Sequence, residues 1–154
     1  MQSNYIANFP HAELSSQDES SKITLCAYSY EFPQVTSGWD ADWLKVYFHL
    51  CIPGFQIEMD EPMLDVASLK KFADELQALS ELRCNAAELF PIEPYILLNL
   101  SLSRQKKVIV DGTVCNMSRQ NDAKLKFSFM TDLTYIDAFA KGLQEILEKF
   151  PPRK

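Results

Sequence analysis

The side chains best suited to catalysis are His49 and Cys51, which stand two positions apart in a stretch of alternating apolar and polar residues. On a strand such residues share a face about 7 Å apart, so the imidazole could activate the thiol if Glu58 oriented the ring. Every strand, however, places alternate residues on one face. No helix N-terminus is expected beside Cys51 to lower its pKa, and no oxyanion-hole element is recognisable. We therefore expect no catalytic residues and no enzyme activity.

Other familiar chemistry is limited by the residue types present. The four glycines, at positions 38, 54, 112 and 142, are too far apart for a G-x-G-x-x-G motif or a phosphate loop. Histidines at 11 and 49 cannot form H-E-x-x-H, and G-x-S-x-G is absent. Asp40 and Asp42 could join Glu58 and Asp60 around a divalent cation, but no EF-hand spacing supports this, and a solvated acidic rim is the simpler interpretation. We expect no metal and no cofactor.

The acidic charge of the chain is concentrated in one segment. Residues 31–65 contain seven acids and one base, so this segment alone has the net charge of −6 that the whole chain has. Segregated charge of one sign steers association with a partner of the opposite sign. The pI of about 4.9 argues against nucleic-acid binding, which needs a basic face. The charge pattern therefore indicates a basic protein partner.

The same segment contains aromatic residues that could anchor a partner. Trp39 lies in the loop of this segment, and Trp43 and Tyr47 fall on the polar face of the expected strand, where aromatic side chains are typical of interfaces. Alternatively, the N-terminal segment or a loop covers them within the monomer. We expect the partner-binding residues to be Asp40, Asp42, Trp43, Tyr47, Glu58, Asp60 and Glu61.

The clearest secondary structure surrounds these residues. Residues 43–52 alternate strictly, Pro53-Gly54 turns the chain, and residues 55–60 alternate again. A two-residue turn would pair Leu50 with Ile57 on the apolar face and Tyr47 with Asp60 on the polar face. The apolar face should then be occupied by helices. Because Pro-Gly favours a type II turn, which suits two-residue hairpins poorly, a bulge is the alternative.

The remaining elements predict an α+β fold. Residues 23–32 alternate weakly, and residues 95–129 contain three alternating stretches typical of an antiparallel meander. Apolar residues at helical spacing predict amphipathic helices near 68–80 and 134–150. No internal repeat is evident. We expect a mostly antiparallel sheet of about six strands with two amphipathic helices packed on one face.

The chain of 154 residues is long enough for one domain with a core of its own. Residues 1–21 are polar and Ser-rich and should form a loosely ordered arm, residues 22–150 the domain, and residues 151–154 a C-terminal tail. The four cysteines are far apart, and no charged-then-apolar leader is visible. No apolar run is long enough to cross a bilayer. We expect a reduced, cytoplasmic protein without membrane contact.

The order of these pieces resembles the WapI family of bacterial immunity proteins over residues 22–150. The resemblance rests on Asp42-Trp43-Leu44-Lys45-Val46, Pro53-Gly54, the helix from Ser68 to Leu79, Phe90-Pro-Ile-Glu93 before Tyr95 to Leu102, and Asp132-Leu-Thr-Tyr-Ile136. It implies a small cytoplasmic protein that binds and blocks the C-terminal domain of a cognate toxin, often a nuclease. It implies no catalytic residue. The competing hypothesis is an adaptor or structural module with an unrelated protein partner.

Overall fold

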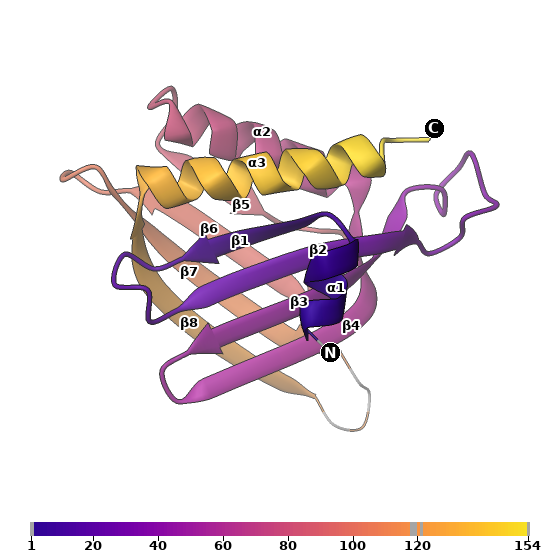
Figure 1. Ribbon diagram of the computed structural model, residues 1–154, viewed down its shortest axis with the longest axis horizontal. Helices are drawn as coiled ribbons and strands as arrows, with labels where there is room; N and C mark the ends of the chain where they lie inside the picture. The colour runs from indigo at the N-terminus through magenta and orange to yellow at the C-terminus, as the bar shows by residue number, and fades with distance from the viewer. Residues whose placement is uncertain (1, 118–119, 121, 154) are drawn as a thin grey trace.

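The computed structural model describes residues 2–117, 120 and 122–153, which form three helices and eight strands (Figure 1). Their bounds are α1 Gln2–Asn8, β1 His11–Ser15, β2 Lys22–Tyr30, β3 Trp43–Ile52, β4 Phe55–Asp65, α2 Val66–Ser80, β5 Ala86–Leu89, β6 Ile96–Leu102, β7 Lys107–Asn116, β8 Ala123–Asp132 and α3 Leu133–Lys149. Four strands followed by a helix occur twice, ending in α2 and in α3. The fold is therefore a repeated structural unit preceded by the short helix α1.

The strands form two antiparallel sheets rather than one. The first sheet has the order β1-β2-β3-β4, and the second has the order β5-β6-β7-β8. The α+β class is confirmed, and the structure differs from the prediction in having eight strands in two sheets where about six in one sheet were expected. The additional strands, β1 and β5, have five and four residues and lie at sheet edges. Alternation over so few residues is too brief to be recognised in a sequence.

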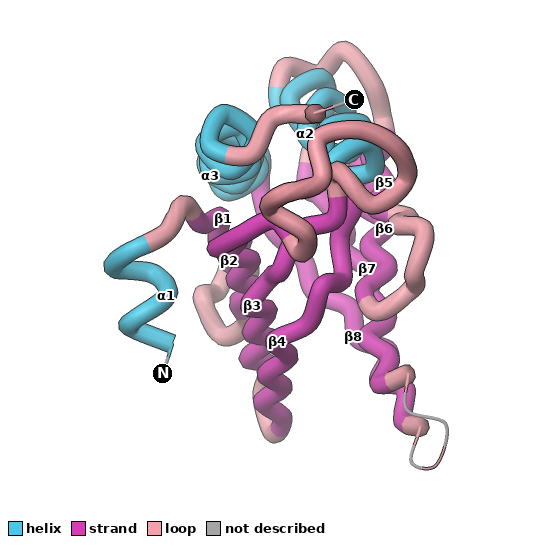
Figure 2. The backbone as a smooth tube through the Cα atoms, turned by 90° about the vertical axis from the view of Figure 1, so that its right-hand side faces the viewer, coloured by secondary structure: helices cyan, strands magenta, loops and turns pink. Residues whose placement is uncertain are grey.

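The helices α2 and α3 lie side by side at one end of the two sheets (Figures 1 and 2). Each begins after an aspartate cap: the Asp65 carboxylate accepts a hydrogen bond from the Ser68 N–H, and Asp132 caps α3 in the same way. Phe72 and Phe139 occupy equivalent places in the two helices and meet edge to face, with ring centroids 6.1 Å apart. Among the described residues, no helix has the length and apolar character that crossing a membrane requires.

Each helix packs against the edge strand of the other half, α3 against β1 and α2 against β5. Gly142 of α3 permits the closest approach, because a Cβ atom there would lie 2.7 Å from the Ala12 Cα and 2.7 Å from the His11 carbonyl oxygen. In α2, the Glu75 carboxylate accepts a hydrogen bond from the Glu88 N–H of β5, with an N···O distance of 2.9 Å. Because each helix packs on a strand of the other half, the two halves share one hydrophobic core.

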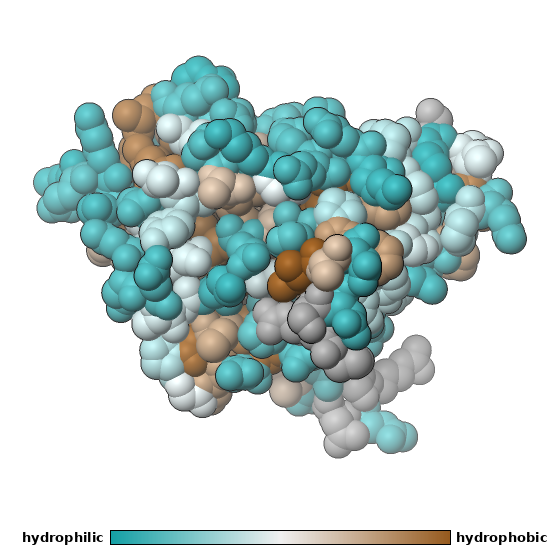
Figure 3. Space-filling model, in the orientation of Figure 1, coloured by the Kyte–Doolittle hydropathy of each residue, from teal (hydrophilic) through white to brown (hydrophobic). Residues whose placement is uncertain are grey.

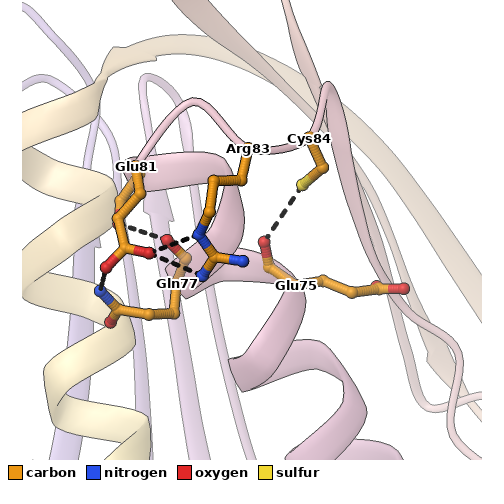
Figure 4. A network of polar contacts seen from close by, with 6 residues as sticks. Glu75, Gln77, Glu81, Arg83 and Cys84 are labelled. Atoms are coloured by element: carbon orange, nitrogen blue, oxygen red, sulfur yellow. Dashed lines mark hydrogen bonds and ion pairs between the residues drawn. The ribbon is translucent and has the colours of Figure 1, made fainter.

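A polar network ends α2 and directs the chain into β5 (Figure 4). The side-chain amide of Gln77 donates to the Glu81 carboxylate at 2.9 Å, and a guanidinium nitrogen of Arg83 lies 2.6 Å from the same carboxylate. Both contacts lower the pKa of Glu81, and the Gln77 hydrogen bond is the larger cause. The Cys84 thiol then donates to the Glu75 carbonyl oxygen, with an S···O distance of 3.6 Å. These contacts reverse the chain direction, so that β5 runs beside α2.

The β3–β4 hairpin has the predicted register. Leu50 pairs with Ile57, and Tyr47 pairs with Asp60. Gly54 has a φ of 88°, the conformation that the second central residue of a type II turn requires. The register shift in this hairpin lies at the end far from the turn. The hairpin therefore places Tyr47, Glu58 and Asp60 on its outer face.

The N-terminal segment is more ordered than the sequence indicates. Residues 11–15 form β1, which pairs with β2, and Ala12 and Leu14 are completely buried. The prediction of a loosely ordered arm is wrong for this strand. Two buried apolar side chains are enough to order this short strand because α3 packs on them. At the other end of the chain, the Arg153 guanidinium lies 3.6 Å from the centroid of the Tyr30 ring, so the tail is packed on the domain.

Candidate partner-binding surface

The seven residues predicted to bind a partner differ widely in exposure. Four of them are exposed: Asp40, Glu58, Asp60 and Glu61. Trp43 is half-buried, and Asp42 and Tyr47 are buried, with only 5% and 3% of their surface exposed. The exposed ones do not all share a face, because Glu61 pairs with Val46, whose side chain is buried in the core. The structure thus divides the predicted site between the two faces of the first sheet.

Helix α1 covers the outer face of the first sheet (Figure 2). The Tyr5 ring stacks on the Tyr47 ring with centroids 4.6 Å apart and planes 4° apart. Tyr28 completes the cluster, since its ring lies 5.3 Å from Tyr5 and 5.9 Å from Phe9. The interpretation that the N-terminal segment covers Tyr47 within the monomer is therefore confirmed. Tyr47 cannot contact a partner while α1 is in place.

The carboxylates on this outer face bind tyrosine hydroxyls. Asp60 accepts hydrogen bonds from the hydroxyls of both Tyr5 and Tyr28, and Glu58 accepts one from Tyr47 at 3.0 Å. The hydrogen bond to Asp60 is the main reason that the pKa of Tyr5 is raised. Burial is the first cause, and the carboxylate hydrogen bond the second, of the raised pKa of Tyr28 and of Tyr47. Asp60 therefore holds α1 on the sheet through Tyr5, whereas Glu58 fixes the Tyr47 ring on which Tyr5 stacks.

We expect Tyr5→Ala to release α1 and expose the Cys26 thiol. That thiol is fully buried, donates to the Tyr5 carbonyl oxygen at 3.4 Å, and has a pKa that burial raises to about 11. Loss of the stacked ring should increase its reactivity roughly tenfold, the factor that about 1.4 kcal/mol of docking energy gives. The measurement is the rate of thiol labelling in a chain whose other three cysteines, Cys51, Cys84 and Cys115, are replaced by serine.

Tyr135→Ala is the matched control, because Tyr135 also donates its hydroxyl to a carboxylate, that of Glu19, but lies far from α1 in the sequence and on α3. It should leave the labelling rate of Cys26 unchanged. Equal labelling rates in the Tyr5→Ala variant and the parent would show that other contacts hold α1 in place.

The carboxylates proposed for a cation have separate partners. The Asp42 side chain accepts a hydrogen bond from the Arg153 N–H at 2.8 Å, while Asp60 and Glu58 accept from tyrosines. Among the residues that the structure describes, no three His, Cys, Asp or Glu side chains are grouped to hold a metal ion. His49 lies opposite Glu58 in the register, and one oxygen of the Glu58 carboxylate accepts the hydrogen bond from Tyr47.

A second group of acids lies near Tyr95 or near Glu31, and we call it the acidic rim: Glu31, Asp40, Glu61 and Glu93. Burial, then the charges of Glu61, Glu93 and Glu31, raise the pKa of Tyr95. Burial also raises the pKa of Glu31, with smaller effects from Glu93 and Asp40, while Lys45 opposes them. Three segments distant in sequence are thus close enough to repel one another. None of the four forms an ion pair with a base in the described part of the chain.

Large apolar side chains stand next to the rim acids in the same loops. Trp39, beside Asp40, is 86% exposed, and Ile92, beside Glu93, is 62% exposed. Exposed aromatic and aliphatic side chains of this size next to unpaired charge are typical of protein interfaces. Sequence reasoning missed Glu93 and Ile92 because only the stacking of the second sheet on the first brings the loop before β6 near β4.

The C-terminal tail supports the loop that carries Trp39 and Asp40. Arg153 donates from its guanidinium to the carbonyl oxygens of Phe32, Pro33 and Ala41 at 3.0, 2.9 and 2.9 Å. Its backbone N–H donates to Asp42, as described above. Asp42 therefore positions the base of the loop and leaves the exposed tip for contact.

Two solved structures are similar to this chain over nearly its whole length. A chain in "Crystal structures of trypanosoma bruciei MRP1/MRP2" aligns with a TM-score of 0.53 at 10% identity, covering 96% of this chain and 90% of that one, so the two share a fold. A chain in "Structure of the plant transcriptional regulator PBF-2" aligns with a TM-score of 0.45 at 12% identity, covering 95% and 90%. No curated protein sequence matches significantly. The model of the immunity protein WapI-like family matches residues 13–151, so the chain belongs to this family of immunity proteins.

Proposed function

We propose that this protein neutralises a toxin by binding it through the acidic rim and the exposed side chain of Trp39. The family supports a toxin-neutralising role in general. The observation that carries the specific surface is the set of four rim carboxylates, which form no ion pair with a described base and among which Glu93 and Asp40 repel Glu31. Basic residues of a partner would replace this repulsion with attraction.

A nuclease is the class of toxin that this surface fits best. A nuclease must present basic residues where it binds the phosphates of its substrate, and an acidic protein surface can bind to the same residues and block the site. Neutralisation then needs no catalysis by this chain. Trp39 would supply affinity as a desolvated anchor, while the acids would supply the association rate and selectivity. Of the seven residues predicted from the sequence, Asp40 and Glu61 belong to this surface.

The test is co-expression with the C-terminal domain of the toxin encoded beside this protein, inside the producing cell's cytoplasm. We expect the cells to grow, the two chains to co-purify as a 1:1 complex, and association to slow as salt is raised. A toxin that remains fully active and does not co-purify would refute the proposal. A stable complex that leaves the toxin active would favour the alternative, an adaptor module.

A further inference from the structure

A cleft is lined by residues of both sheets, from β4 of the first and from β7 and β8 of the second. It lies at the ends of these strands away from the helices, where the backbones of the two sheets are apart in Figure 2. Its volume is about 540 Å³, within the usual range for binding sites. The first sheet contributes the apolar side chains of Phe55, Ile57 and Met59, and the second contributes Val114 and Leu125. The walls are therefore the inner apolar faces of two sheets that meet closely at the helices and separate at this edge.

The cleft is open because the helices do not reach it. The sequence predicted that helices occupy the whole apolar face of the β3–β4 hairpin, and this is wrong: α2 and α3 lie at the other end. Phe55 is 56% exposed, and Ile57 and Met59 are only half-buried. Hydrophobic atoms are visible near the β3–β4 turn in the space-filling view (Figure 3). Apolar surface of this kind is stabilised when a partner removes it from water.

The charges around the cleft differ between its two walls. Glu61 lines the wall formed by β4 and also belongs to the acidic rim, whereas the carboxylates of Glu58 and Asp60 on the same strand bind tyrosines on the outer face. Lys124 lies on the opposite wall. A side chain entering beside β4 thus meets apolar groups in the cleft and a carboxylate at its mouth. This arrangement suits an apolar residue whose neighbour in sequence is lysine or arginine.

We infer that the cleft receives an amphipathic basic segment of the toxin, with apolar side chains between the sheets and a cationic neighbour paired with Glu61. The identity of this occupant rests on the proposed function. The cleft is continuous with the acidic rim, because Tyr95 lines the cleft and also lies among the rim acids. The bound toxin segment would therefore contact both parts of one interface, the apolar cleft at its centre and the charged rim at its border.

The experiment compares Ile57→Asp with Met130→Asp. Both substitutions place a carboxylate at a partly exposed apolar position on a strand, but Met130 lies on β8 outside the cleft. We expect Ile57→Asp to weaken binding of the toxin domain at least thirtyfold and Met130→Asp to change it less than threefold. Phe55→Ala, at a more exposed position, should weaken binding without any loss of fold.

The neutral apolar dye Nile red separates failure of the cleft from failure of the proposed function. The parent and Met130→Asp should bind the dye, Ile57→Asp should not, and the toxin domain should displace it from the parent. Dye binding that is equal in both variants would overturn the cleft as an apolar site, whatever the toxin does. Loss of dye binding with unchanged toxin binding would overturn the occupant and leave toxin neutralisation intact.

Discussion

Replacing Glu61 and Glu93 together by lysine should weaken toxin binding about 100-fold or more, which corresponds to about 2.7 kcal/mol. Both side chains act on Tyr95, and neither forms an ion pair with a described base, so both are free to attract a basic partner. The two lysines would repel that partner. The loss should appear mainly as slower association at low salt and should shrink as salt rises.

The control is Glu145→Lys with Glu148→Lys, which makes the same change in net charge at exposed positions of α3. It should leave affinity for the toxin nearly unchanged, and an equal loss in both variants would mean that only total charge matters.

The stability of the rim variant, in which Glu61 and Glu93 are lysine, should not fall. The raised pKa of Glu31 means that its ionised form is disfavoured in the folded state, so its penalty is present at neutral pH and disappears as pH falls through that pKa. Replacing Glu93 removes a negative charge beside Glu31, and this reduces the free-energy cost of ionised Glu31 in the folded state.

Gly142→Ala should destabilise the fold by about 2 kcal/mol, although alanine in a helix normally stabilises it by about 1 kcal/mol relative to glycine. The new methyl group would lie 2.7 Å from the backbone of β1, which cannot move aside without disturbing β1–β2 pairing. The melting temperature should fall by roughly 4–8 °C. The sign of the effect is the informative result, because helix propensity and packing predict opposite signs.

Glu148→Ala is a suitable control on the same helix, because its side chain is exposed. It should change the melting temperature by no more than a degree or two. A Gly142→Ala variant as stable as the parent would show that α3 can shift away from β1 at little cost, and the two halves would then be less tightly joined than their contacts indicate.

The sequence predicted elements whose patterns are long and local. The stripes that become α2 and α3, and the hairpin register from Leu50 opposite Ile57, follow from side-chain period and a two-residue turn. The repeat is not evident in the sequence because the equivalent strands of the two halves have different residues. The helices retain it, since Phe72-Ala73 and Phe139-Ala140 stand at equivalent positions and are buried in both. A comparison of the two helix stripes could have revealed it.

The candidate site was predicted less well because its parts come together only in three dimensions. Tyr47 was correctly placed on the outer face, but its cover, α1, comes from residues whose polar character indicated disorder. Glu93 joins Glu61 only through the stacking of the second sheet. No local period carries that information, because the approach of two sheets depends on which apolar faces remain after each has formed.

The repeated unit also indicates how such a protein can have arisen. A gene encoding one half, once duplicated and fused, would convert a homodimer centred on the Phe72 and Phe139 pair into a single chain. The two halves differ most in the connection between their second and third strands. Residues 31–42 form a long loop with Trp39 and Asp40 in the first copy, whereas residues 103–106 suffice in the second. A substitution in the longer loop can therefore alter contact with a partner without touching the equivalent strands of either half.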